Sequence, residues 1–190
     1  IPNFANLFMT SPEINIDPTI AGSVVGTYWF LMMIGRLCGA SIGAKVSSRA
    51  RLTVVSTVGI VLVLGAIFCA DNILVNMPVF KSDISFGFAQ VPVNVMLLIL
   101  CGLCTSVMWG GIFNLAVEGL GKYTAAASGL FMVMVCGGGI LPLIQGGVAD
   151  FAGFLNSYWV IALGLAYILF YAAIGSKNVN TDIPTDDYEA

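Results

Sequence analysis

The sequence predicts an all-α membrane protein, a polytopic transmembrane helix bundle, and three observations lead to that fold class. Hydrophobic residues make up 58% of the 190-residue chain and charged residues only 9%, whereas about 25% of the residues in a soluble domain are charged. The mean hydropathy is +0.97. The uncharged residues also fall in runs long enough to cross a bilayer, for which a helix needs about 20 apolar residues.

Charge and cysteine content exclude several other classes. The chain has a net charge of -3 and only seven Lys and Arg, too few for the basic surface that binding to nucleic acid requires. Its five cysteines are odd in number and lie inside apolar runs, which indicates buried thiols and not a disulfide framework. Cys101 and Cys104 form a CxxC pair, but the chain contains no histidine. We therefore expect no metal site and no other cofactor.

Residues 1–17 are expected to be the outer end of a helix followed by an extracellular loop. Residues 1–9 are apolar apart from two asparagines. The chain starts at Ile1, without an initiating Met and without the pattern of a signal peptide. We therefore interpret it as a fragment of a longer polypeptide, in which residues 1–9 belong to a sixth, truncated span.

Five complete spans are predicted within residues 18–176. The first follows Asp17, whose carboxylate can cap the free amides, and Pro18 suits the first helical position. The uncharged run from Ile84 to Val117 is too long for one straight span, so its helix is expected to start after Pro92 and the preceding piece to be loop. The predicted spans are about 18–44, 52–70, 93–117, 123–149 and 156–175. Residues 177–190 are polar and acidic and are expected to form a solvated tail.

The distribution of basic residues predicts the orientation of these spans. If the spans alternate in direction, one side of the membrane receives six Lys and Arg and the other side receives only Lys81. Cytoplasmic loops are the ones that retain basic residues. We therefore expect the first span to enter from outside and the C-terminal tail to be cytoplasmic.

Side chains at membrane depth suggest a ligand, although none of them is acidic. Every Asp and Glu falls at a predicted helix end, in a loop or in the tail, whereas proton relays usually place an ionisable group at depth. Rings can stack on the apolar face of a sugar, and amides or hydroxyls can bond to its hydroxyl groups. We expect substrate contacts from Asn3, Tyr28, Trp109, Asn114 and Gln145. The alternative is that such side chains only pack between helices.

Glycines predict close helix packing and one break. Small residues recur at every fourth position of the first and third spans, a pattern that lets helix backbones approach closely. They are Gly22 and Gly26, then Gly35, Gly39 and Gly43, and then Gly102, Ser106 and Gly110.

The fourth span contains Gly137, Gly138 and Gly139, followed by Pro142. This combination should kink or unwind the helix. Transporters place substrates or hinges at such breaks, and the alternative is a packing kink with no moving role.

Two segments resemble a known family. The segment GRLCGASIGAKVSSRARL resembles the loop between the second and third helices of each half in the major facilitator superfamily. The segment IFNLAVEGLGKYTAAASGLFMVMVCGGGILPLIQGGVAD is similar to the tenth and eleventh helices of the fucose permease-like branch of sugar:proton symporters. The chain departs from these patterns at Ala44-Lys45, where an aspartate is often found. It also departs at Trp109-Gly110 and Asn114, in place of an aromatic-proline pair and a serine.

The resemblance implies that the chain is the C-terminal six-helix half of a secondary active transporter. Residues 18–176 would be helices eight to twelve, and the missing N-terminal half of the same chain would be the partner. The implied activity is sugar:proton symport by alternating access, with fucose, glucose or galactose as cargo and the coupling acids in the first half. The implied location is the bacterial inner membrane. Arg36 and Glu118, both at cytoplasmic helix ends, are expected to pair as a latch that breaks when the inside opens.

Other functions remain open from the residues alone. The same fold could carry a nucleoside, another small polar solute or a drug. A channel or a structural membrane protein is also conceivable, although neither needs the cationic loop and the glycine-proline break together. A membrane enzyme is disfavoured because the chain has no histidine and no paired acids at depth.

Overall fold

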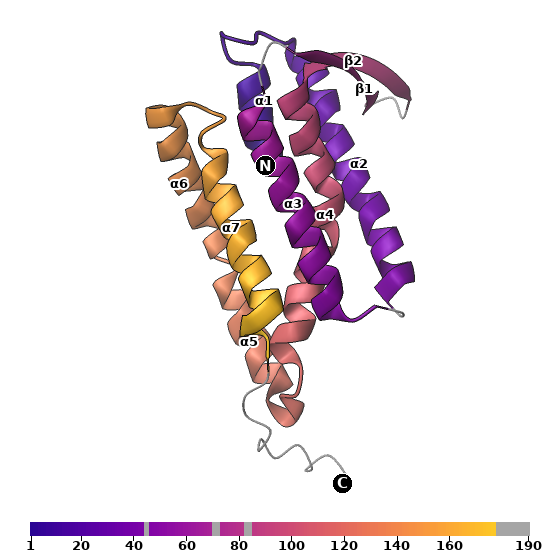
Figure 1. The fold of residues 1–190 in the computed structure, drawn as a ribbon, viewed down its shortest axis with the longest axis vertical. Helices are drawn as coiled ribbons and strands as arrows, with labels where there is room; N and C mark the ends of the chain where they lie inside the picture. Colours follow the sequence, from indigo (N-terminus) through magenta and orange to yellow (C-terminus); the bar gives the residue numbers. More distant parts are fainter. Residues whose placement is uncertain (44–45, 70–72, 82–84, 178–190) are drawn as a thin grey trace.

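The computed structural model describes residues 1–43, 46–69, 73–81 and 85–177. It shows a helical bundle with a two-stranded sheet across one end (Figure 1). The helices are α1 Pro2–Met9, α2 Pro18–Gly43, α3 Ser48–Phe68, α4 Val93–Val117, α5 Thr124–Met134, α6 Gly137–Ala152 and α7 Tyr158–Phe170. A 3₁₀ turn, Gly121–Tyr123, precedes α5, and a π turn, Tyr171–Gly175, follows α7.

Five helical segments of the described chain are long and apolar enough to cross a membrane, as the sequence predicted. They are Pro18–Ser41, Ser48–Phe68, Val93–Val117, Gly121–Ala152 and Tyr158–Gly175. The second begins four residues before the expected position, because Ser47 caps it: the Ala50 amide donates a hydrogen bond to Ser47 Oγ at 3.3 Å. Arg49 and Arg51 therefore lie on the first turn of α3 and not in the preceding loop.

The start of α2 matches the predicted cap. The amide of Thr19 donates to Asp17 Oδ1 at 2.8 Å, and Pro18 is the first helical residue. Hydrogen bonds from the Thr19 backbone and side chain lower the pKa of the Asp17 carboxyl from its ordinary value. The charged form is thus the one that caps the helix.

Helix α4 is the centre of the bundle and packs against both α2 and α3, while α3 also packs against α7. Glycines make the contact of α2 with α4 possible. A Cβ at Gly35 would overlap the Ser106 side chain, and one at Gly102 would lie 2.7 Å from the Tyr28 carbonyl oxygen. The predicted close approach is therefore confirmed at these positions. At Gly22 and Gly110, no atom of the described chain lies within 4 Å of a Cβ, so not every member of the pattern is a contact there.

The expectation of loop before α4 is wrong, because residues 86–92 form a strand. Strand β1, Leu74–Phe80, pairs antiparallel with β2, Phe86–Pro92, with Leu74 opposite Pro92 and Phe80 opposite Phe86. Met77, Val79, Ala89 and Val91 are buried, while the residues between them are exposed or half-buried. This period of two is the mark of a strand with one packed face. The uncharged run hid it, because hydropathy alone does not distinguish a strand from a helix of similar composition.

The predicted break in the fourth span is confirmed. Helix α5 ends at Met134 and α6 begins at Gly137. The amides of Val135 and Cys136 bond to carbonyls three residues back, and those of Gly138 and Gly139 do the same. The helix is therefore tightened into 3₁₀ turns at this point. Pro142 lies inside α6, where it leaves one backbone carbonyl without its helical donor.

The two ends of the bundle differ in character. One end carries the β-hairpin, and we call it the hairpin end. The other carries the start of α3 and the end of α4, with Arg49, Arg51 and Lys122, and we call it the basic end (Figure 1). The predicted tail, residues 177–190, lies outside the described residues apart from Lys177.

Candidate functional site

A strip of aromatic and hydroxyl side chains runs along α4 between its neighbours α2 and α5. It consists of Tyr28 from α2, Thr105 and Trp109 from α4, and Phe131 from α5. Thr105 and Trp109 are one turn apart on α4 and share a face, as the sequence predicted. We call this set the aromatic strip.

Tyr28 is the packed end of the strip. Its side chain is only 4% exposed, and its hydroxyl shares a 2.9 Å hydrogen bond with Thr105 Oγ1. Thr105 Oγ1 also donates toward the Cys101 carbonyl at 3.1 Å. The hydroxyl pair thus ties α2 to α4 and leaves Tyr28 little surface for a solute in this conformation.

Trp109 is the open end of the strip. Its side chain is 48% exposed, and the adjacent Gly110 has no atom within 4 Å of a Cβ. The ring meets Phe131 of α5 edge-on, with centroids 5.2 Å apart, and Phe113 meets the same Phe131 ring at 5.5 Å. A half-exposed indole fixed by a second ring can offer part of its surface for stacking on an apolar ligand. Sequence reasoning missed Phe131, because its contact with Trp109 depends on the tilt of α5.

Asn114 does not lie with Trp109. Five residues separate them on α4, which places them about 140° apart around the helix. Asn114 instead lines a cavity of about 590 Å³ at the basic end, together with Ser47, Ser48, Arg49 and Glu118. The helical period of about 3.6 residues is enough to predict that Trp109 and Asn114 lie on different faces of α4.

Arg36 and Glu118 lie at different levels of the bundle. Gly35 is packed on Ser106, and the C-cap Glu118 lies about 18 Å further along α4. The exposed Arg36 has its Nη2 3.9 Å from Met32 Sδ. The cation that shares the Glu118 cavity is Arg49, whose Nη2 also donates to the Ser176 carbonyl at 3.0 Å. Arg49 is a functional candidate that the sequence reasoning placed in a loop and did not single out.

Asn3 and Gln145 come from neighbouring elements near the hairpin end. Asn3 is exposed on α1, and the ring of the next residue, Phe4, lies 3.9 Å from where a Cβ of Gly146 would be. Gln145 is 2% exposed, and its Nε2 donates to Ser157 Oγ at 3.3 Å. Gln145 therefore joins α6 to the start of α7 in this conformation.

The glycines of the break make no close contact with the described residues. Among these residues, no atom lies within 4 Å of a Cβ position at Gly137, Gly138 or Gly139. Whatever the break does, it does not bring helices together at these positions. Its effect is on the direction of the fourth span, between α5 and α6.

Comparisons with known proteins find curated relatives but no solved structure. The chain is 28% identical over 179 residues to the glucose/galactose transporter of Brucella abortus, covering 94% of this chain and 39% of that protein. It is 30% identical over 169 residues to the putative glucose/galactose transporter of Helicobacter pylori, with 86% and 37% covered. The L-fucose-proton symporter of Escherichia coli is 33% identical over 92 residues, with 48% and 21% covered. No family model and no solved structure matches the chain.

These relatives agree with the motifs. They are named as transporters or symporters and not as enzymes, in agreement with the expectation from the motifs. The chain spans 39% or less of the length of each of them. Together with its five apolar helices, the similarity shows an integral membrane protein that is related to proteins named glucose/galactose transporter and L-fucose-proton symporter, as the resemblance to the fucose permease-like branch of the major facilitator superfamily implied.

Proposed function

We propose that the protein containing this chain is a secondary active transporter for a sugar of the fucose, glucose or galactose class. One observation carries the proposal: similarity to glucose/galactose transporters extends over 94% of the chain. The aromatic strip supports it, because a half-exposed indole beside hydroxyl groups is suited to a pyranose ring. The proposal includes symport of a proton with the sugar, with the coupling acids in the N-terminal half of the transporter.

Transport would proceed by alternating access, in which the two halves rock about a site near the middle of the membrane. Trp109 would stack on the sugar. Tyr28 and Thr105 would offer their hydroxyls once the α2–α4 contact loosens, since they now bond to each other. Asn3 and Gln145 would contribute from the hairpin side. Asn114 lines the cavity at the basic end, so it would contact the solute only as the solute leaves toward that end. Gly137 to Gly139 and Pro142 would form a hinge.

The proposed latch is an ion pair at the basic end. Glu118 is its acid, and Arg36 is the cation that the sequence suggested. The cavity shared by Glu118 and Arg49 favours Arg49 as a second candidate. A partly solvated pair is worth about 1 kcal/mol or less, enough to bias two conformations. Arg36→Gln and Arg49→Gln should be compared for uptake rate and for labelling of inward-facing cysteines. Unchanged uptake and labelling in a variant would remove that cation from the latch.

Location and orientation complete the proposal. We place the protein in a bacterial inner membrane with the basic end and the C-terminus in the cytoplasm. The uneven distribution of Lys and Arg between the two ends supports this orientation.

The experiment that tests the function is uptake by the full-length protein in a strain lacking its own hexose and nucleoside permeases. Labelled glucose, galactose and fucose should accumulate against a gradient, and a protonophore should abolish the accumulation. Accumulation of a labelled nucleoside instead would contradict the sugar assignment. If sugar accumulation continues in the presence of the protonophore but stops when sodium is removed, the coupling ion is sodium and not the proton.

A further inference from the structure

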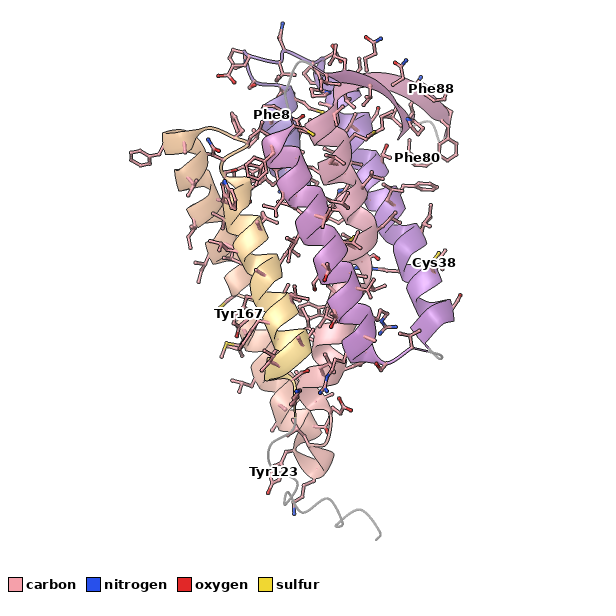
Figure 2. The ribbon with its side chains drawn as sticks, viewed as in Figure 1. Phe8, Cys38, Phe80, Phe88, Tyr123 and Tyr167 are labelled. Atoms are coloured by element: carbon pink, nitrogen blue, oxygen red, sulfur yellow. The ribbon has the colours of Figure 1, made fainter. Side chains whose placement is uncertain are left out.

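A groove on the side of the bundle, away from the aromatic strip, has features of a separate binding site. It lies between α2 and α3 and has a volume of about 360 Å³. Its floor is formed by Leu103 and Val107 of α4, and its walls include Gly39 of α2 and Val54 of α3. We call it the side groove. Cys38, also on its rim, is labelled in Figure 2 on the half of α2 toward the basic end.

The side groove exists because both walls pack on α4. Gly35 and Gly39 lack side chains and touch Ser106 and Val107 closely. This contact draws α2 onto α4, and α3 packs on α4 separately. The channel left between α2 and α3 is lined almost entirely by carbon, and Val54 at its edge is 60% exposed.

One charged side chain closes the groove at the basic end. Arg51 reaches from the first turn of α3 to the last turn of α2, where its Nη1 donates to the Gly39 carbonyl at 3.2 Å. Its guanidinium also lies beside Gly43. Arg51 Nε is buried and has no hydrogen-bond partner in the described part of the chain. Arg51 thus places a positive charge at the basic end of an otherwise apolar groove.

We propose that the side groove binds a membrane phospholipid, with one acyl chain on Leu103, Val107 and Val54 and the phosphate on Arg51. A guanidinium matches phosphate oxygens in geometry and charge, and basic pockets between membrane helices bind lipid head groups. The lipid belongs to the leaflet at the basic end, where Arg49 and Lys122 add positive charge. An apolar protein helix covering the groove would leave the Arg51 charge without a counter-charge, which is costly in the membrane. This inference is independent of the cargo.

The test uses the full-length protein, purified in detergent and incubated with 1-palmitoyl-2-oleoyl-phosphatidylglycerol, with bound lipid counted by native mass spectrometry. Arg51→Gln should reduce retention of one bound lipid by about fivefold, and Arg51→Lys should reduce it less. Val54→Trp should have a similar effect to Arg51→Gln, because the indole fills the acyl site without altering charge. Val58→Trp is its matched control, since Val58 is also exposed on α3 but outside the groove. Arg36→Gln controls for loss of a positive charge elsewhere.

Each outcome decides the proposal. Retention by Arg51→Gln equal to the wild type would overturn it, and so would equal losses in Val54→Trp and Val58→Trp. Displacement of the lipid by the same concentration of inorganic phosphate would also overturn it, since the site would then recognise the anion without the chain. If Arg51→Gln does not fold, the paired tryptophan variants still give the answer, because both sites are exposed on one face of a helix.

Discussion

Trp109 and Trp159 are similar in exposure and in their ring contacts, but only Trp109 lies on the aromatic strip. The Trp109 ring meets Phe131 at the edge and is bordered by the open Gly110. Trp159 on α7 is exposed to a similar degree, 42% against 48%, and it also meets one phenylalanine edge-on, Phe68 at 6.1 Å. Trp159 is therefore a matched control for Trp109, since it lies outside the aromatic strip.

Replacing Trp109 by Ala should lower sugar uptake by about tenfold, because the stacking surface for the sugar is lost, and a factor of ten corresponds to about 1.4 kcal/mol. Trp109→Phe should retain part of the activity, since a smaller ring remains. Initial uptake rates over a range of sugar concentrations measure the effect. Trp159→Ala should leave uptake within about twofold of the wild type at equal expression. Equal losses in Trp109→Ala and Trp159→Ala would mean that Trp109 only packs.

At the scale of elements, the contact between α2 and α4 depends on glycine at particular positions. A Cβ at Gly35 would overlap the Ser106 side chain and come within 2.9 Å of the Leu103 carbonyl oxygen, whereas Gly22 on the same helix has nothing within 4 Å. Gly35→Ala should therefore destabilise the protein by about 1–3 kcal/mol. Gly22→Ala should be neutral or stabilising, because alanine favours the helix by about 1 kcal/mol. Thermal unfolding of both variants in detergent measures the difference, and equal midpoints would contradict it.

The break between α5 and α6 allows a test that separates movement from packing. Because no atom lies within 4 Å of a Cβ at Gly137, Gly138 or Gly139, alanine at all three should not disturb contacts in the described chain. It should favour a continuous helix by about 1 kcal/mol per position. If the break is a hinge, uptake should slow severalfold while thermal stability is kept or raised. Gly147→Ala, with equally open surroundings, is the control. Unchanged uptake in the triple variant would indicate a static kink.

The sequence was informative wherever one property dominated. Long apolar runs predicted the five spans, and Asp17, the repeated small residues and the glycine-proline cluster predicted a cap, a close contact and a break. It failed where two properties competed. Phe86 to Val91 alternate between exposed and buried, but the uncharged run around them concealed the strand. The pairing of Trp109 with Phe131, and of Arg49 with the Glu118 cavity, depends on how helices tilt, which no local pattern records.

On the scale of the whole molecule, the hairpin end and the basic end are chemically unlike. The hairpin projects beyond α2, with Phe80 and Phe88 at its outer part (Figure 2). Phe80 stacks on Phe30 of α2 at 4.9 Å, and its amide donates to Thr27 Oγ1 at 2.9 Å. The hairpin is thus fastened to the wall of the bundle. At the opposite end, Arg49 reaches the Ser176 carbonyl after α7, which joins the start of α3 to the end of the last span.

This asymmetry leads to a prediction about orientation. Moving the basic end across the membrane would carry Arg49, Arg51 and Lys122 through it, whereas the hairpin end carries only Lys81 among the described basic residues. We therefore expect the hairpin outside the cell.

The test starts from a variant in which the exposed or half-buried cysteines Cys38, Cys69 and Cys136 are changed to Ser. One accessible thiol is then added, by Asn76→Cys on the hairpin or by Tyr123→Cys at the basic end. A membrane-impermeant maleimide should label Asn76→Cys on intact cells and Tyr123→Cys only after the membrane is opened. The reverse pattern would invert the orientation and would place Arg51 and its proposed lipid in the outer leaflet, while the internal geometry of the bundle would be unaffected.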